Sequence, residues 1–131
     1  MSVLVGKKAP TFTTQAVLPD GTIDESFSLD SAFEGKYGVL FFYPMDFTFV
    51  CPSEILAMAN RTEELRAMGC EVVGVSVDSH WTHNAYRNTS VDDGGIGPVP
   101  FALAADMTRE ISVAYGILAE SPDSYYPPGV S

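Results

Sequence analysis

A continuous apolar run, Val39–Tyr43, constrains the fold most, because it leads through Pro44 into a helical pattern. An uninterrupted run of this kind suits a strand that is covered on both faces. From Pro52 to Met68 the apolar residues fall on one stripe of a helix, and Pro52 suits its first turn. A buried strand that runs directly into a helix is the repeating unit of α/β proteins.

The same alternation continues along the chain. The further elements that we expect are a strand at Val72–Val77, a short helix capped by Asp78 and Ser79, a strand at Phe101–Ala105 and a helix at Met107–Tyr115. Strands joined by helices pair in parallel through right-handed crossovers. The sequence therefore predicts one α/β domain over residues 1–131, with a mostly parallel sheet flanked by helices. Residues 1–36 are interpreted as an N-terminal segment with turns at Leu18–Gly21 and Phe33–Lys36.

The composition excludes several classes of partner. Seven Lys and Arg against seventeen Asp and Glu give a net charge of −10, which argues against nucleic acid and anionic membrane surfaces. No run of 18 apolar residues and no secretory leader is visible, so we expect a cytoplasmic protein. His80 and His83 lie three residues apart on the short helix, and without carboxylate or cysteine partners to complete a site we expect no metal; no organic cofactor is expected either.

One of the two cysteines, Cys51, lies where the strand turns into the helix, immediately before Pro52. A free cysteine has a pKa of about 8.5, and a helix N-terminus with nearby donors can lower it to about 3.5–7.5. Cys51 is therefore a candidate nucleophile, with a packed structural cysteine as the alternative. Thr48 is close enough in sequence to hydrogen-bond the sulfur, or it serves only the backbone of the turn. Pro44 fixes the chain as it leaves the strand, or simply ends the strand.

The spacing Pro44-x-x-x-Thr48-x-x-Cys51, within the stretch Asp46–Pro52, resembles the active-site signature of the peroxiredoxin family. The resemblance is to the typical two-cysteine group, which includes the peroxidase subunits of bacterial alkyl hydroperoxide reductases. It extends from about Gly6 to Leu118. Further segments that carry it are Val75–His80, Gly94–Pro98, Asp106–Arg109 and Tyr115–Gly116.

The resemblance implies a thioredoxin-like fold and a thiol peroxidase of antioxidant defence. Cys51 would attack hydrogen peroxide or a small organic hydroperoxide and become a sulfenic acid, while Thr48 hydrogen-bonds the sulfur and the peroxide. Pro44 would screen the pocket, and backbone N–H groups near Val50 and Cys51 would polarise the O–O bond. The implied partners are a thiol reductant, either thioredoxin-like or a flavin-dependent disulfide reductase, and further copies of the chain in a homodimer or a ring of dimers.

The chain departs from the family pattern in its C-terminal part. The family's catalytic arginine lies on a strand beyond the third helix, and Arg109 matches a different position, at the start of that helix. The resolving cysteine has no counterpart near the C-terminus. Cys70 is separated from Cys51 by a helix of about 25 Å, whereas disulfide Cα atoms approach within about 7 Å, so we expect Cys70 to be structural.

The family's C-terminal β-hairpin and final helix also lack a counterpart, so the chain is interpreted as truncated, or as one that pairs the edge of its sheet with another subunit. Their loss would leave Val39–Tyr43 at an exposed apolar edge of the sheet. A non-catalytic scaffold or a peroxide sensor with the same fold and thiol remains the alternative to a complete peroxidase.

Overall fold

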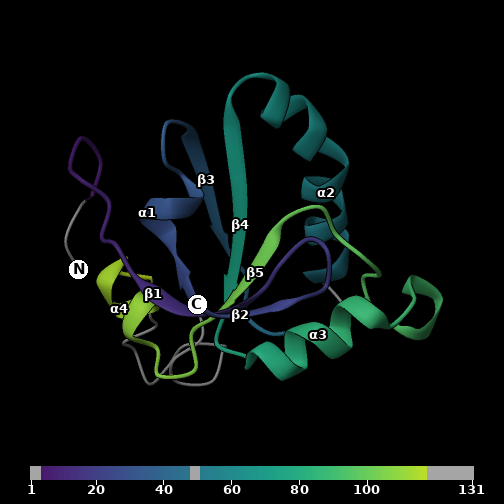
Figure 1. The fold of residues 1–131 in the computed structure, drawn as a ribbon. Helices are drawn as coiled ribbons and strands as arrows, with labels where there is room; N and C mark the ends of the chain where they lie inside the picture. The colour runs from purple at the N-terminus through teal and green to yellow at the C-terminus, as the bar shows by residue number, and fades with distance from the viewer. Residues whose placement is uncertain (1–3, 48–50, 118–131) are drawn as a thin grey trace.

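The computed structural model describes residues 4–47 and 51–117, apart from the side chains of Cys51 and Pro52 (Figure 1). Strands and helices alternate through most of this part of the chain. In order, the elements are β1 (Thr13–Val17), β2 (Ile23–Ser28), α1 (Leu29–Ala32), β3 (Tyr37–Phe42), α2 (Cys51–Ala67), β4 (Cys70–Ser76), α3 (His80–Asn88), the 3₁₀ turn Val91–Asp93, β5 (Ala102–Ala105) and α4 (Glu110–Ala114).

The strands form one mixed sheet in the order β2-β1-β5-β4-β3. β3, β4 and β5 are parallel, with Phe42 opposite Val75 and Val75 opposite Ala104, which confirms the predicted parallel pairing. β1 runs antiparallel to both β5 and β2. At the carboxyl ends of the three parallel strands the chain passes into the loops that lead to α2, α3 and α4.

The N-terminal segment contains a hairpin that the turn-based interpretation of residues 1–36 missed. The predicted turn is present, since the Gly21 N–H donates to the Leu18 carbonyl at 2.9 Å. Gly21 has φ +89°, a conformation that L side chains rarely adopt. The two strands that flank this turn, β1 (TTQAV) and β2 (IDESFS), are half exposed and rich in polar residues. They therefore carry no continuous apolar run that would have marked them as strands.

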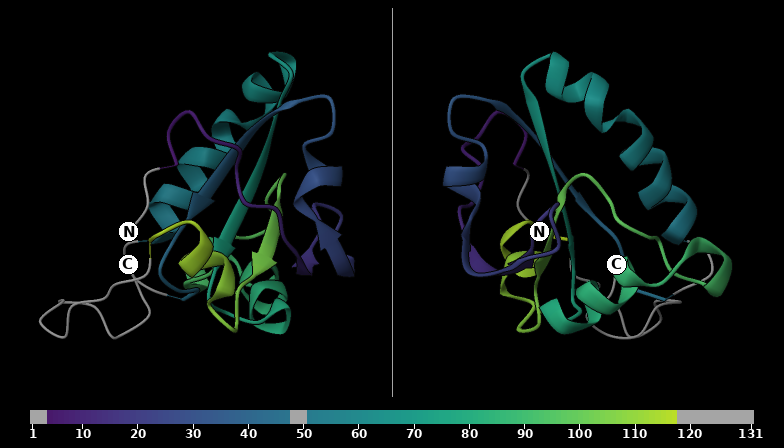
Figure 2. Two further views of the ribbon diagram at one scale, coloured as in Figure 1. Left: turned by 90° about the vertical axis from the view of Figure 1, so that its left-hand side faces the viewer. Right: turned by 45° about the vertical axis from the view of Figure 1, so that its right-hand side comes forward.

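Helices cover both faces of the sheet: α2 and α3 lie on one face, and α1 and α4 on the other (Figures 1 and 2). β4 contributes to both cores, with Val72 on the α2 side and Val73 and Val75 on the opposite side. Gly74 leaves room for the Phe41 ring, whose nearest atom would lie 2.8 Å from an added Cβ. β4 and β5 are therefore the buried centre of the sheet, whereas β3, predicted to be covered on both faces, contacts both cores but contains no fully buried residue.

Within the described residues β3 is an edge strand with a neighbour on one side only, as predicted for Val39–Tyr43. Tyr37, its first residue, is 78% exposed. The described part of the chain also contains no helix that is long and apolar enough to cross a membrane.

Helix α4 is shorter than the predicted span Met107–Tyr115. The carboxylate of buried Asp106 accepts hydrogen bonds from the N–H groups of Ile111 at 3.0 Å and Ser112 at 2.8 Å. Arg109 precedes the helix in a left-handed conformation with φ 64°. The side-chain cap thus takes the place of the first helical turn that the sequence pattern suggested.

Candidate active site

Cys51 is the first residue of α2, the longest helix of the described chain, with 17 residues. The chain reaches it from the carboxyl end of β3, where ligands bind in open α/β sheets. A thiolate at this position lies at the positive end of the helix dipole. The placement agrees with the strand-to-helix turn predicted for the nucleophile. The other predicted contributors Thr48 and Val50 lie outside the described residues.

Pro44 is half-buried and follows the last backbone bond of β3 to its neighbour. The Tyr43 N–H donates to the Val75 carbonyl at 3.0 Å, one residue beyond the end of β3. Pro44 has no N–H to continue this ladder, so the chain leaves the sheet here. This is the change of direction expected of Pro44, while its screening of the pocket stays a prediction.

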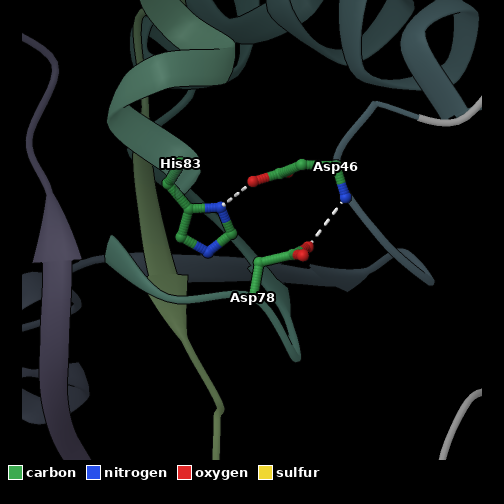
Figure 3. A group of neighbouring side chains, drawn as sticks. All are labelled: Asp46, Asp78 and His83. Carbon is green, nitrogen blue, oxygen red and sulfur yellow. Dashed lines mark hydrogen bonds and ion pairs between the residues drawn. The ribbon is translucent and has the colours of Figure 1, made fainter. Parts of the chain in front are cut away.

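A buried network of side chains lies between this loop and helix α3 (Figure 3). The Asp46 carboxylate accepts from the Tyr43 hydroxyl at 2.7 Å through Oδ1, and Oδ2 lies 2.7 Å from His83 Nδ1. On the far side of the ring, His83 Nε2 lies 2.9 Å from the Ala104 carbonyl oxygen. The side chains of Asp46 and His83 have no exposed surface.

The expectation that His83 lacks a carboxylate partner is therefore wrong. Asp46 is 37 residues away in the chain and reaches the ring because β3 and β4 are parallel neighbours. The signal that could have found the pair is positional: Asp46 and His83 both follow the carboxyl ends of parallel strands, which meet at one edge of the sheet.

Asp78 ties the same loop to the end of β4. Its Oδ2 accepts from the Asp46 N–H at 2.7 Å and from the Ser76 hydroxyl at 2.6 Å. Candidate ligand atoms of Asp46, Asp78 and His83 lie within 4.8 Å of one another, a spacing that could hold a metal ion. The hydrogen bonds just described already account for the arrangement of these three side chains.

The Tyr43 hydroxyl keeps its proton over the whole physiological range. Burial raises the pKa of Tyr43 well above its ordinary value of 10.0, and the negative charge of Asp46 raises it further. Tyr43 is therefore a permanent hydrogen-bond donor to Asp46.

Phe47 follows the network with a left-handed backbone, φ 59°, which is unusual for a bulky residue. Its ring packs against Tyr86 of α3 at a centroid distance of 4.7 Å and is 48% exposed. A left-handed conformation costs roughly 1–2 kcal/mol, so the surrounding contacts must impose it.

The remaining candidates from the sequence are Cys70 and Arg109. Cys70 opens β4 beyond the far end of α2 and is a free, half-buried cysteine. The intervening 17-residue helix spans about 25 Å, too far for a disulfide to Cys51. Arg109 is exposed at the start of α4, in agreement with the helix-start position expected for it.

Comparisons with known proteins agree with this architecture. The model of the AhpC/TSA family matches residues 5–128. Peroxiredoxin-2 of Macaca fascicularis is 54% identical over 114 residues, which are 87% of this chain and 56% of that protein. Peroxiredoxin-1 of Gekko japonicus is 50% identical over 122 residues, covering 93% of this chain and 60% of the relative.

Solved structures give the same result. The reduced 2-Cys peroxiredoxin of Plasmodium vivax superimposes with a TM-score of 0.85 at 41% identity, over 91% of this chain and 61% of that one. AhpC of Mycobacterium bovis gives a TM-score of 0.75 at 30% identity, over 88% of this chain and 68% of that one. The fold is thus the thioredoxin-like α/β fold of the 2-Cys peroxiredoxins.

The chain belongs to the AhpC/TSA family, which confirms the resemblance stated from the motifs. It spans a little over half the length of the curated relatives that it matches.

Proposed function

We propose that this chain carries the peroxide-reducing half of a thiol peroxidase, with Cys51 as the nucleophile. The observation that carries the proposal is the position of Cys51, as the first residue of a 17-residue helix that follows the carboxyl end of β3. Family membership supports the assignment, because the relatives named above are peroxiredoxins.

The proposed reaction is a two-electron transfer. The Cys51 thiolate attacks one oxygen of hydrogen peroxide or a small organic hydroperoxide, so that an S–O bond forms as the O–O bond breaks. The leaving hydroxide or alkoxide takes up a proton and departs as water or alcohol. Sulfur is oxidised to a sulfenic acid and the peroxide is reduced. Negative charge moves from sulfur to oxygen, and we assign the donors that stabilise it to Thr48 and to backbone N–H groups near Val50.

The proposed partners complete this cycle. A thiol reductant, thioredoxin-like or a flavin-dependent disulfide reductase, returns the sulfenic acid to the thiol. We further propose that the 131 residues form one domain and act in the cytoplasm. Copies of the chain are proposed to associate as a homodimer or a ring of dimers. Support comes from exposed apolar residues that follow three strand ends: Phe47 (48%), Trp81 (66%) and Met107 (60%).

A single-turnover experiment tests the proposal. Reduced protein is mixed with one equivalent of hydrogen peroxide, and the oxidation of Cys51 is followed by rapid quench and peptide mass. We expect a rate at least about a hundredfold above that of a free thiolate, an enhancement that one or two well-placed oxyanion donors can supply. Cys51→Ser abolishes the reaction, and Cys70→Ser serves as the matched control that leaves it unchanged. A rate equal to that of a free thiolate would favour the scaffold or sensor alternative.

A further inference from the structure

We propose that Asp46 and His83 are positioning residues for the proposed peroxidase: their buried pair holds the chain that enters α2, so that Cys51 is presented to peroxide in a reactive geometry. This inference rests on the proposed function of Cys51. Neither residue is proposed to touch the substrate. Asp46 lies five residues before Cys51 in the chain, on the loop that follows β3 (Figure 3).

The first support is that Asp46 makes hydrogen bonds to three different parts of the fold. Its Oδ1 accepts from Tyr43 at the end of β3, and its Oδ2 meets His83 of α3, both at 2.7 Å. Its N–H donates to Asp78, which follows β4, also at 2.7 Å. Three separate parts of the fold thus hold one loop residue, although most loop residues are bonded mainly to water and to their own turn.

The second support is that the pair must share a single proton. The Ala104 carbonyl can only accept, so His83 Nε2 carries a hydrogen. The 2.7 Å contact between His83 Nδ1 and Asp46 Oδ2 then needs one hydrogen, which lies either on the ring or on the carboxyl group. In both forms the pair is neutral overall, and the bonds from Tyr43 to Asp46, between Asp46 and His83, and from His83 to Ala104 are all made; the Tyr43 hydroxyl also lies 3.3 Å from His83 Nδ1. The site therefore avoids an uncompensated buried charge, which would be costly at 0% side-chain exposure.

The third support is the strained residue that comes next. Phe47 adopts φ 59° between the tied Asp46 and its own contact with Tyr86. The strain persists because the groups on both sides determine it, and strained backbone of this kind concentrates at functional sites. Release of Asp46 would let Phe47 relax, four residues before the proposed nucleophile.

Hydrogen-bond chemistry distinguishes two substitutions at one position. Asp46→Asn can still accept from Tyr43 through its oxygen and donate from its amide to neutral His83 Nδ1, so it reproduces the neutral form of the pair. Asp46→Ala makes neither bond. His83→Phe keeps a ring of similar size without either nitrogen. If the pair positions Cys51, Asp46→Asn should therefore react with hydrogen peroxide at the wild-type rate, whereas Asp46→Ala and His83→Phe should react more slowly.

The experiment compares two rates of Cys51 in the full chain at one pH. Hydrogen peroxide requires aligned donors around the sulfur, whereas iodoacetamide reports mainly whether the thiolate is present and accessible. We expect His83→Phe and Asp46→Ala to lose at least about tenfold in the peroxide rate, because a displacement of about 1 Å can cost a hundredfold. The iodoacetamide rate changes by less than about threefold. Asp46→Asn retains the peroxide rate within about threefold, and Asn88→Ala, at the exposed end of α3, is the control.

Each outcome decides between the two claims. If wild-type Cys51 reacts with hydrogen peroxide no faster than a free thiolate does, the proposed function is rejected. If the wild type and His83→Phe react with hydrogen peroxide equally fast, only the positioning role is rejected. The positioning role is also rejected if His83→Phe loses as much in the iodoacetamide rate as in the peroxide rate, because that result indicates a general loss of structure. Equal losses in Asp46→Asn and Asp46→Ala also reject it. If His83→Phe does not fold, Tyr43→Phe removes one donor to Asp46 and is expected to lower the peroxide rate about fivefold, the equivalent of one hydrogen bond, with the iodoacetamide rate unchanged; equal rates with peroxide would reject the positioning role.

Discussion

The buried pair Asp46–His83 makes a quantitative prediction for stability. Each side chain is fully enclosed, and each depends on the other for one short hydrogen bond of 2.7 Å. Removal of one partner leaves the other buried without it, which typically costs 3–5 kcal/mol. Tyr43 still donates to Asp46, and Ala104 still accepts from His83, so we place each single substitution near the lower limit, about 3 kcal/mol.

The double substitution should cost much less than the sum of the two. Once His83 is replaced by Phe, little remains for Asp46→Ala to break apart from the bond from Tyr43, which is worth about 1 kcal/mol. We expect about 4 kcal/mol for the double variant, against about 6 kcal/mol for independent sites. The coupling free energy is therefore about 2 kcal/mol, within the range measured for residues in one network.

Urea denaturation at pH 7, followed by far-UV circular dichroism, measures all four free energies of unfolding. Glu63→Ala, on the exposed side of α2, is the control and should shift the value by less than about 0.5 kcal/mol. If the effects of Asp46→Ala and His83→Phe add within about 0.5 kcal/mol, the two side chains do not form the coupled pair described above.

Three further predictions concern other parts of the molecule. Burial opposes ionisation of Glu71, but hydrogen bonds and charge from Arg66 hold its pKa below the ordinary 4.5, so its contribution is present above pH 4.5 and disappears as the pH falls through the folded-state pKa. Glu71→Gln should thus cost about 0.5 kcal/mol at pH 7 and progressively less as the pH falls below 4.5 in urea titrations; a difference that does not change with pH would contradict this. Asp106→Ala leaves two buried N–H groups and the Ser112 hydroxyl without their acceptor, and should lower the unfolding free energy by about 3 kcal/mol; a change below 1 kcal/mol would reject the capping role. Thr48→Val should slow peroxide reduction by about 1–3 kcal/mol of activation free energy in single-turnover kinetics, and an unchanged rate would remove Thr48 from the site.

Much of the fold was predictable because buried parallel strands leave a direct signal. The runs at Val39–Tyr43 and Val72–Val77 are apolar without alternation, and they became the parallel strands β3 and β4, on whose two faces helices pack. The hairpin β1–β2 gave no such signal, since its strands are short, half exposed and rich in polar residues. Only its turn, with Gly21, was visible in the sequence.

In the candidate site, too, local features were predictable from the sequence and contacts between distant residues were not. Cys51 was predictable because its position depends on local sequence, a strand followed by a helix. The partnership of Asp46 with His83 depends on which strands become neighbours, and 37 residues separate the two in the chain. The start of α4 was misplaced for a related reason, because the side chain of Asp106 replaces the backbone acceptors that an earlier helical turn would have supplied.

The most direct test of the central claim is a competition for peroxide. The reduced protein is mixed with a tenfold excess of free cysteine and then with less than one equivalent of hydrogen peroxide, and oxidised Cys51, as the sulfenic acid or as the mixed disulfide that it forms with cysteine, is quantified by peptide mass. Nearly all of the peroxide is expected to oxidise Cys51, because its proposed surroundings stabilise the charge that develops on oxygen. Oxidation divided in proportion to the two thiolate concentrations would contradict it.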